Sequence, residues 1–438
     1  MRILNWADLD AESRSDLVER RDTSRAMFAP ELRSQIEALV DDVEQRGDAA
    51  LADALQKFDG IKPGSAPTIF GAAEIAAAAA SVDPLVRKAI KVAVERSREF
   101  NEALKPEAEW MQTLKPGLRV GEKVTAIESA GLFVPSGKGS FPSVLVQIGT
   151  PAKVAGVERL VVIVPPVPGG NGEVDSAVLA VAHELGIDSV LCANGPAGVA
   201  AVALGTETIE PVVKVVGPGS PPVAAAMLEC QRRGCVTQMV LGPTESAIVA
   251  DASADIDLLA ADLLNEAEHG PDTSAFLITP NPEILDDLAE RVEARLADLP
   301  AQRAEWARIA ITANGGVVVV SDLAEAASVL NAIAPEHAQL AVADPEALLE
   351  LVLHAGEVLL GQAASFSLAN YTIGVPASLP TGRFARVSSG ITAETFLKRT
   401  SIAHLTPEAN EALTDAALAL AEHEDFPAHA AALRARRT

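Results

Sequence analysis

The feature that most constrains the fold is a regular alternation of short apolar runs with helix-like segments. In the first block, apolar runs at 160–165, 189–193 and 214–216 alternate with helix candidates at 174–185 and 198–204. A second block has apolar runs at 247–250, 275–279, 317–320 and 358–360, with a helix candidate at 256–268. Buried strands joined by helices are typical of parallel βαβ units. The sequence therefore predicts an α/β fold with two blocks of parallel sheet.

The segments around these blocks are expected to be helical. Helical spacing runs through 8–60, where Asp59-Gly60 supplies a stop, and continues through 71–113. The C-terminal forty residues are Ala-rich and predict further helix. A chain of 438 residues predicts two to four domains, at roughly 100–200 residues each.

Charge and composition exclude several classes of protein. The formal net charge is −25, which argues against a general nucleic-acid binder. No apolar run approaches the roughly 18 residues that span a bilayer, and the charged N-terminus lacks the apolar stretch of a signal peptide. Three cysteines, Cys192, Cys230 and Cys235, predict a reducing compartment without a disulfide framework. We expect a cytoplasmic protein with no membrane or nucleic-acid partner.

The candidate chemical groups are histidines beside carboxylates. Glu266 and His269 are three residues apart, so on a helix they share a face and can ligate Zn²⁺. Glu336-His337 can serve as a general acid and base, although Pro335 before them suits an ordinary helix start. For both pairs the spacing alone favours a polar helix end. A third pair, Glu424 and His429, fits a solvated helix face.

Two glycine-rich loops suggest a dinucleotide site without its standard signature. Gly137-Lys138-Gly139 and 217–219 each lack the remainder of a G-x-G-x-x-G fingerprint. No Walker loop, G-x-S-x-G elbow or paired C-x-x-C is present in the sequence. The residues by themselves therefore predict an acidic cytoplasmic α/β enzyme, and they leave a metal requirement open.

Taken in order, several segments resemble motifs of the histidinol dehydrogenase family over nearly the whole chain. They are GLFVPSGKGSFPS, GTETIEPVVKVVGPG, GPTESAIVADASAD, LLNEAEHGPD, NAIAPEHAQL, and the pair LPTGRFARVSSG and FLKRTS. The resemblance implies a Zn²⁺-dependent enzyme that oxidises the amino alcohol L-histidinol to L-histidine through an aldehyde, using two NAD⁺. It further implies that His337 takes the alcohol proton and that Glu336 activates the water of the second oxidation.

The implied zinc ligands depart from the family pattern in a compensating way. They fall on Glu266, where the family usually has Gln, on His269, on Asn370, where it usually has Asp, and on His429. One carboxylate is kept and all four side chains still offer lone pairs, so we expect the metal site to survive. The alternative is that two ligands were lost independently in a decaying metal site. Such losses would favour side chains that cannot bind a metal, whereas Glu and Asn both can.

The implied substrate pocket departs further. Its positions fall on Thr244, Glu424 and the residues already named as base and ligands, Glu266, His269, His337, Asn370 and His429. Ala377 stands where the family has a substrate-contacting His, and Arg383 adds a cation where the family has a small residue. An alanine cannot hydrogen-bond an imidazole, whereas an arginine can pair with an anion. Alone, Arg383 is an ordinary surface residue. With Ala377 it favours a paralogue acting on a different small alcohol, an anionic one included.

The implied cofactor positions fall on Phe133, Ala197 and Ser220, which replace Tyr, Gln and Asn. Each lost hydrogen bond is worth roughly 0.5–1.5 kcal/mol, so weakened or re-aimed dinucleotide binding is expected. A non-redox, metal-binding scaffold is therefore a rival interpretation. The retained Glu336-His337 pair argues against it.

The resemblance also implies the architecture. We expect an N-terminal segment at 1–25 and a large α/β domain at 26–133 and 245–394 that carries the metal and catalytic residues. A second Rossmann-like domain at 134–244 is inserted in it. A helical tail at 395–438 completes a homodimer, and its Glu424 and His429 reach the active site of the other subunit.

Overall fold

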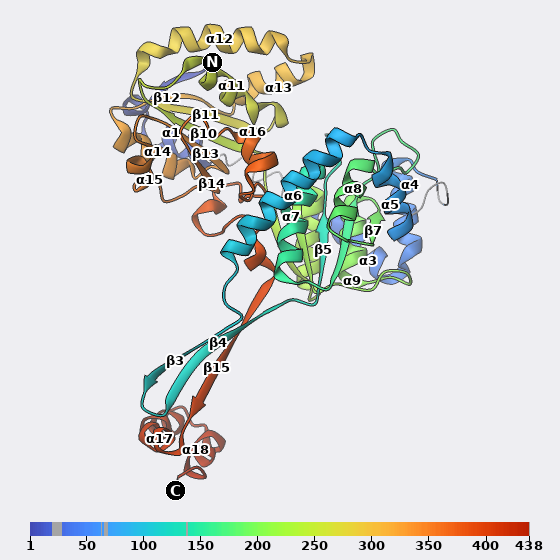
Figure 1. Cartoon of the computed structure of the whole chain (residues 1–438), viewed down its shortest axis with the longest axis vertical. Helices are drawn as coiled ribbons and strands as arrows, with labels where there is room; N and C mark the ends of the chain where they lie inside the picture. Colours follow the sequence, from blue (N-terminus) through green and yellow to red (C-terminus); the bar gives the residue numbers. More distant parts are fainter. Residues whose placement is uncertain (20–28, 63, 65–68, 137–138, 438) are drawn as a thin grey trace.

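The computed structural model describes residues 1–19, 29–62, 64, 69–136 and 139–437. Figure 1 shows two α/β lobes side by side and a long arm that leaves them and ends in two helices. Each lobe holds one six-stranded sheet, and a three-stranded sheet forms the arm. The α/β prediction is confirmed.

The first sheet lies in the lobe that contains the middle of the chain. Its order is β2-β7-β6-β5-β8-β9, with β2 antiparallel to β7 and the other pairs parallel. Strands β5 and β6 are apolar and almost wholly buried, as expected for strands covered on both faces. The strands are β2 (Ile69–Phe70), β5 (Ser129–Phe133), β6 (Arg159–Val164), β7 (Val190–Cys192), β8 (Lys214–Gly219) and β9 (Val236–Leu241).

Two helical layers cover this sheet. One layer forms a core with β5 to β8, and comprises α3 (Pro30–Arg46), α4 (Asp48–Asp59), α9 (Gly195–Leu204) and α10 (Pro221–Arg232). The opposite layer comprises α5 (Ala72–Ser81), α6 (Pro84–Leu104), α7 (Pro142–Ala155) and α8 (Ser176–Glu184).

The second sheet is parallel throughout and has the order β1-β12-β11-β10-β13-β14. Its strands are β1 (Ile3–Asn5), β10 (Glu245–Ala250), β11 (Ser274–Thr279), β12 (Gly316–Val319), β13 (His337–Ala341) and β14 (Glu357–Leu360). One face is covered by α11 (Ile256–Asn265), α12 (Leu285–Asp298), α13 (Ala301–Thr312) and α16 (Phe366–Leu368). The other is covered by α1 (Ala11–Glu19), α14 (Leu323–Ile333) and α15 (Pro345–Leu349).

Without β1 and β2, the two sheets have the same strand order. Each runs third, second, first, fourth and fifth in its own sequence: β7-β6-β5-β8-β9 and β12-β11-β10-β13-β14. This is the doubly wound order, in which the chain reverses direction between the first and fourth strands. The two blocks of the sequence therefore fold alike.

The structure divides the chain differently from the expected domains. The helices α3 to α6 pack on the sheet of β5 to β9, whereas residues 26–133 were expected with 245–394. The N-terminal segment is also not separate, because β1 pairs with β12; its expected end at residue 25 lies outside the described residues. Amphipathic helices carry no signal for which of two similar sheets they cover.

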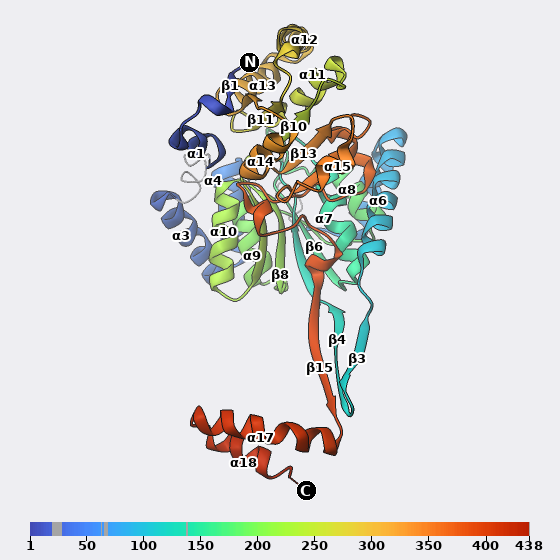
Figure 2. The same ribbon diagram turned by 90° about the vertical axis from the view of Figure 1, so that its left-hand side faces the viewer.

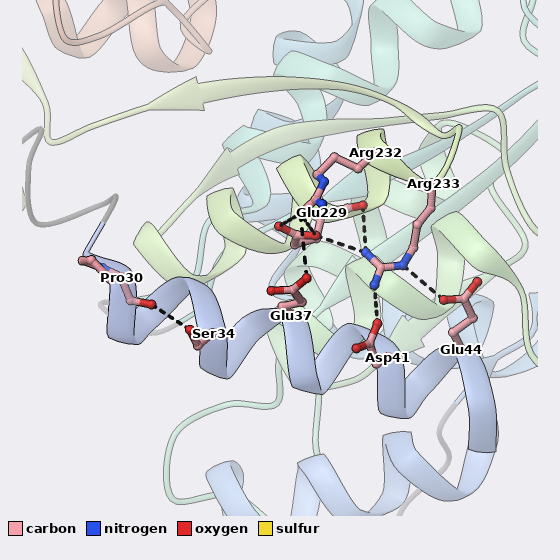
Figure 3. A network of polar contacts seen from close by, with 8 residues as sticks. All are labelled: Pro30, Ser34, Glu37, Asp41, Glu44, Glu229, Arg232 and Arg233. Carbon is pink, nitrogen blue, oxygen red and sulfur yellow. Dashed lines mark hydrogen bonds and ion pairs between the residues drawn. The ribbon is translucent and has the colours of Figure 1, made fainter.

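Ion pairs join the N-terminal helix α3 to α10, as Figure 3 shows. Arg233, just beyond α10, bonds to Asp41 of α3, and its guanidinium lies 3.1 Å from Glu44 of α3 and 3.2 Å from Glu229 of α10. Glu229 is 7% exposed, so this cluster, which we call the α3–α10 clasp, is partly shielded from water.

The arm was not predicted. Its strands β3 (Glu109–Lys115), β4 (Leu118–Ala126) and β15 (Leu397–Leu405) pair antiparallel, and α17 (Pro407–His423) and α18 (Pro427–Arg434) follow (Figure 2). Helix was expected at 109–113 and through the whole tail. Strand β3 is mostly exposed and mixes charged with apolar side chains, so it lacks the alternation of a half-buried strand.

Two smaller predictions concern compartment and membrane. All three cysteines are buried and free of disulfide bonds within the described part of the chain. Searching the described residues finds no helix with the length and apolarity required for a bilayer span.

Candidate active site

The candidate site forms where the two sheets meet. Residues 242–244 alone connect the last strand of the first sheet, β9, to the first strand of the second, β10. This short connection sets the carboxyl end of β9 beside the amino end of β10. The polar residues of the site gather along that amino edge, where Glu245, His337 and Glu357 are the first residues of β10, β13 and β14.

His337 is held by contacts on several sides. Its Nδ1 lies 2.5 Å from Oε1 of Glu357, and its Nε2 lies 3.7 Å from Oε1 of Glu336. The ring of Phe366 packs edge-on at 5.8 Å between centroids. His337 begins a central strand, so the expected helix start at Pro335 is wrong. The strand sequence HAQLA hides this, because two of its buried residues are polar.

Glu336 is fixed by the backbone of a second acidic residue, Glu245. Its Oε2 accepts a hydrogen bond from the backbone N–H of Glu245 at 3.3 Å. The side chain of Glu245 in turn accepts from the backbone N–H of Gly382 at 3.1 Å. The loop that carries Gly382 and Arg383 is thereby anchored to the site.

Glu266 and His269 meet at the end of α11, as their spacing predicted. Nδ1 of His269 lies 2.9 Å from Oε2 of Glu266 and 3.4 Å from the hydroxyl of Thr244. The other oxygen of Glu266 accepts from the amides of Asn370 and Asn265, each at 2.7 Å. The structure therefore brings together Thr244, Glu266, His269 and Asn370.

Four buried carboxylates, Glu245, Glu266, Glu336 and Glu357, surround two histidines. Burial raises the pKa of Glu336 to about 7. Burial opposes ionisation of Glu266 as well, but His337 and His269 hold its pKa at about 2. Burial also disfavours the charged form of His337, yet Glu336, Glu266 and Glu357 outweigh it and raise the pKa of the imidazole. This excess of negative charge suits a cation.

The donor set fits a metal ion in part. Oε2 of Glu266 is fully buried, and Nδ1 of His269, 2.9 Å away, is the polar atom recorded beside it. A carboxylate oxygen and an imidazole nitrogen this close are both donor types that zinc accepts. His269 stands beside it, and the Asn370 amide presents an oxygen after rotation by half a turn. One chain supplies no group of three His, Cys, Asp or Glu side chains suited to a metal within its described residues. Any metal ion held here would need a further ligand from elsewhere.

The tail residues lie far from this cluster within one chain. His429 belongs to α18 and Glu424 follows α17, both at the tip of the arm (Figure 1). The ring of His429 packs against that of Phe426, with 5.0 Å between the centroids and a tilt of 39° between the planes. The structure therefore does not bring Glu424 and His429 to Glu266.

The departures at Ala377 and Arg383 lie on one loop. The N–H of Ala377 donates to the side chain of buried Gln147 at 3.1 Å. Arg383 adopts a left-handed backbone with φ of 65°, and its Nε is buried without a hydrogen bond to any described residue. Its closest ion-pair contact that the structure records is Glu19, at 4.0 Å.

The expected cofactor residues gather at the carboxyl edge of the first sheet. Phe133 ends β5, Ala197 lies in α9 and Ser220 precedes α10. Phe133 is 2% exposed and Ala197 0%, so of the three only Ser220 offers its side chain to solvent. Gly137 and Lys138, singled out in the sequence, lie outside the described residues.

Sequence reasoning missed Glu245 and Glu357. Both are acidic residues at the head of a run that is otherwise apolar and buried, ESAIVA and EVLL. An unpaired carboxylate is costly in such a place. A charge at the first position of a predicted buried strand was therefore a signal available in the sequence.

Comparison with known proteins identifies the family and supports the fold. The sequence profile of the histidinol dehydrogenase family matches residues 22–437. The chain belongs to the histidinol dehydrogenase family. It is thus an oxidoreductase of a family that oxidises histidinol to histidine, and the expected family resemblance is confirmed.

Two relatives come from the same bacterium. A histidinol dehydrogenase of Rhizobium meliloti is 40% identical over 415 residues, covering 94% of each chain. A protein named histidinol dehydrogenase homolog from that strain is 37% identical over 430 residues, covering 98% of this chain and 92% of its own. The crystal structure of histidinol dehydrogenase from Elizabethkingia anophelis superposes with a TM-score of 0.92 at 29% identity, covering 99% and 97%.

Proposed function

We propose that the chain is a Zn²⁺- and NAD⁺-dependent dehydrogenase that oxidises a primary alcohol through an aldehyde to a carboxylate. The observation that carries this is the pairing of Glu336 and His337 at the amino edge of the second sheet, buried beside Glu266 and His269. Two titratable groups held 3.7 Å apart in a buried site suit proton transfer in both half-reactions.

His337 is the base of the first oxidation. Nδ1 is occupied by Glu357, so the remaining nitrogen, Nε2, takes the proton when the alcohol O–H bond breaks. Bound NAD⁺ would supply the hydride acceptor for both oxidations. Glu336, whose pKa burial raises, takes a proton from the water that adds to the aldehyde.

Glu266, His269 and Asn370 would hold the metal ion. A bound zinc ion would polarise the substrate oxygen and orient the substrate. His429 would supply the fourth ligand from a second copy of the chain, because the arm places it far from its own Glu266. We therefore propose a homodimer with shared active sites, in which the partner's Glu424 also contacts substrate.

The first sheet would hold NAD⁺ at its carboxyl edge. Strands β5 and β8 are neighbours at the point where the strand order reverses, which is the usual nucleotide position in this topology. Ser220 and the amino end of the twelve-residue helix α10 suit a phosphate group there. The buried Phe133 and Ala197 would shape this edge from below.

A second candidate differs only in substrate. The buried, unbonded Nε of Arg383, on a loop anchored to Glu245, favours a small alcohol that bears an anionic group. The methyl group of Ala377 cannot hydrogen-bond the imidazole of histidinol. The coexistence of a histidinol dehydrogenase and a named homolog in one strain of Rhizobium meliloti supports a paralogue.

The first test is NADH formation by the zinc-loaded protein, with L-histidinol and with short sulfonated or carboxylated primary alcohols. We expect two NADH per alcohol, and loss of activity on chelation that Zn²⁺ restores. Absence of turnover with every alcohol, together with no NAD⁺ binding by calorimetry, would establish the non-redox scaffold.

Arg383→Ala separates the two substrate candidates. If the substrate is anionic, the variant raises KM by about 10-fold or more, because a charged hydrogen bond is worth roughly 1.5–3 kcal/mol, and it leaves the Kd of NAD⁺ unchanged. An unchanged KM would exclude Arg383 from the substrate site.

A further inference from the structure

A buried carboxylate with a single hydrogen-bond partner lies behind the proposed base. Glu357 is 8% exposed, and its Oε1 bonds to Nδ1 of His337 at 2.5 Å. Its other oxygen is buried and has no hydrogen bond with any residue that the structure describes. A lone buried carboxylate is strongly unfavourable, so the ring N–H of His337 is what compensates this one.

The fold itself creates the contact. His337 and Glu357 are partners in the parallel register of β13 and β14, and each is the first residue of its strand. Side chains of paired residues project to the same face of a sheet. The ring of Phe366 packs edge-on against the imidazole of His337, which leaves the imidazole little freedom to rotate.

We propose that Glu357 is a positioning residue that fixes the tautomer of His337. In the neutral imidazole, Glu357 accepts a hydrogen bond from the Nδ1–H group, so Nε2 carries the lone pair and faces Glu336 and the reacting alcohol. When Nε2 takes the alcohol proton, Glu357 stabilises the imidazolium that forms. The inference rests on the proposed role of His337 as base.

The charged surroundings of His337 give this contact a distinct role. Glu336 lies on the Nε2 side, and Glu266 and His269 act from the end of α11. Glu357 alone among them is recorded within hydrogen-bond distance of a ring nitrogen of His337. Removing it therefore frees Nδ1 while it leaves the other groups in place.

The test uses the zinc-loaded, full-length protein with ¹⁵N-labelled histidines. In the wild type we expect a solvent-protected Nδ1 proton on His337, assigned by its disappearance in His337→Asn. Glu357→Ala should abolish that signal and lower kcat about 10- to 100-fold with little change in KM. Glu357→Asp, which keeps the carboxylate, should recover part of the rate.

Asp262→Ala is the matched control. Asp262 is also 8% exposed and bonds to Gln339 of the same strand, so its truncation disturbs the same sheet without reaching His337. It should keep the Nδ1 signal and lower kcat less than about 3-fold. The inference is wrong if the wild type shows no protected Nδ1 proton, if that proton persists in Glu357→Ala, or if both variants lose equal activity. A protein that oxidises no alcohol overturns the proposed function, and the Nδ1 signal still tests the Glu357 contact.

Discussion

The two sheets share a strand order but present opposite edges to the site. The sheet of β5 to β9 turns its carboxyl edge toward the junction and offers backbone and small residues there, including Gly217 and Ser220. The sheet of β10 to β14 turns its amino edge toward the junction and offers Glu245, His337 and Glu357. One scaffold used twice therefore supplies two different halves of the proposed site.

The difference teaches that strand order does not decide which edge is functional. In open parallel sheets ligands usually lie outside the carboxyl ends of the strands. The second sheet departs from this because residues 242–244 join the sheets end to end. Its amino edge then faces the first sheet, and its carboxyl edge points away.

The largest expected effect comes from a substitution at the amino edge of the second sheet that leaves the first sheet unchanged. His337→Asn keeps an N–H that can reach Glu357 but removes the proposed base, so kcat should fall roughly 10²- to 10⁴-fold. The Kd of NAD⁺, measured by calorimetry, should stay within a factor of about 2, because the variant leaves the first sheet intact.

His404→Asn is the control, since His404 is exposed on β15 of the arm. It should leave both quantities unchanged. A weaker NAD⁺ affinity in His337→Asn would mean that the two edges do not act as separate halves.

An intermediate effect is expected from the carboxyl edge of the first sheet. Gly217 has a φ of 147°, and a Cβ there would lie 2.3 Å from the carbonyl oxygen of Phe133. Gly217→Ala should cost about 2–4 kcal/mol of unfolding free energy and weaken NAD⁺ binding, while the zinc content stays at that of the wild type.

Gly234→Ala isolates the backbone part of that cost. Gly234 has a φ of 101°, and a Cβ there meets no described atom within 4 Å. Its alanine variant should lose only about 1 kcal/mol in urea denaturation. Equal losses in the two variants would remove the contact with Phe133 from the explanation.

Much of the fold follows from the sequence, and the exceptions have physical causes. Apolar runs gave strands such as β6 and β12 because burial on both faces demands apolar residues. Strand β13 was not predicted because two of its buried residues, His337 and Gln339, are polar. His337 belongs to the candidate site, and Gln339 donates a hydrogen bond to Asp262. The arm was not predicted because β3 is mostly exposed and lacks the alternation of a half-buried strand.

The site divides in the same way. The contact between Glu266 and His269 could be predicted from their spacing of three residues. The contact between Glu357 and His337 depends instead on the register of two neighbouring strands. Such a contact between residues twenty positions apart requires the sheet topology, which no short motif contains. The proposed ligand His429 shows the extreme case, because its distance from Glu266 within one chain makes it meaningful only in a dimer.

The smallest expected effect concerns the ion pairs that help to hold helix α3 against the first sheet. In the α3–α10 clasp, Arg233 is 20% exposed at its side chain and contacts Asp41, Glu44 and Glu229 (Figure 3). Arg233→Met should lower the unfolding free energy by about 1 kcal/mol at low salt, the upper end of the roughly 0.2–1 kcal/mol of exposed pairs, because several partly shielded charges form one network. The loss should shrink in 1 M salt, where the Debye length is about 3 Å.

Arg46→Met, which breaks the exposed pairs with Asp42 and Asp53, should cost less than about 0.5 kcal/mol. If the two variants lose equally, the clasp contributes no more than surface charge, and the apolar face of α3 alone holds it to the first sheet.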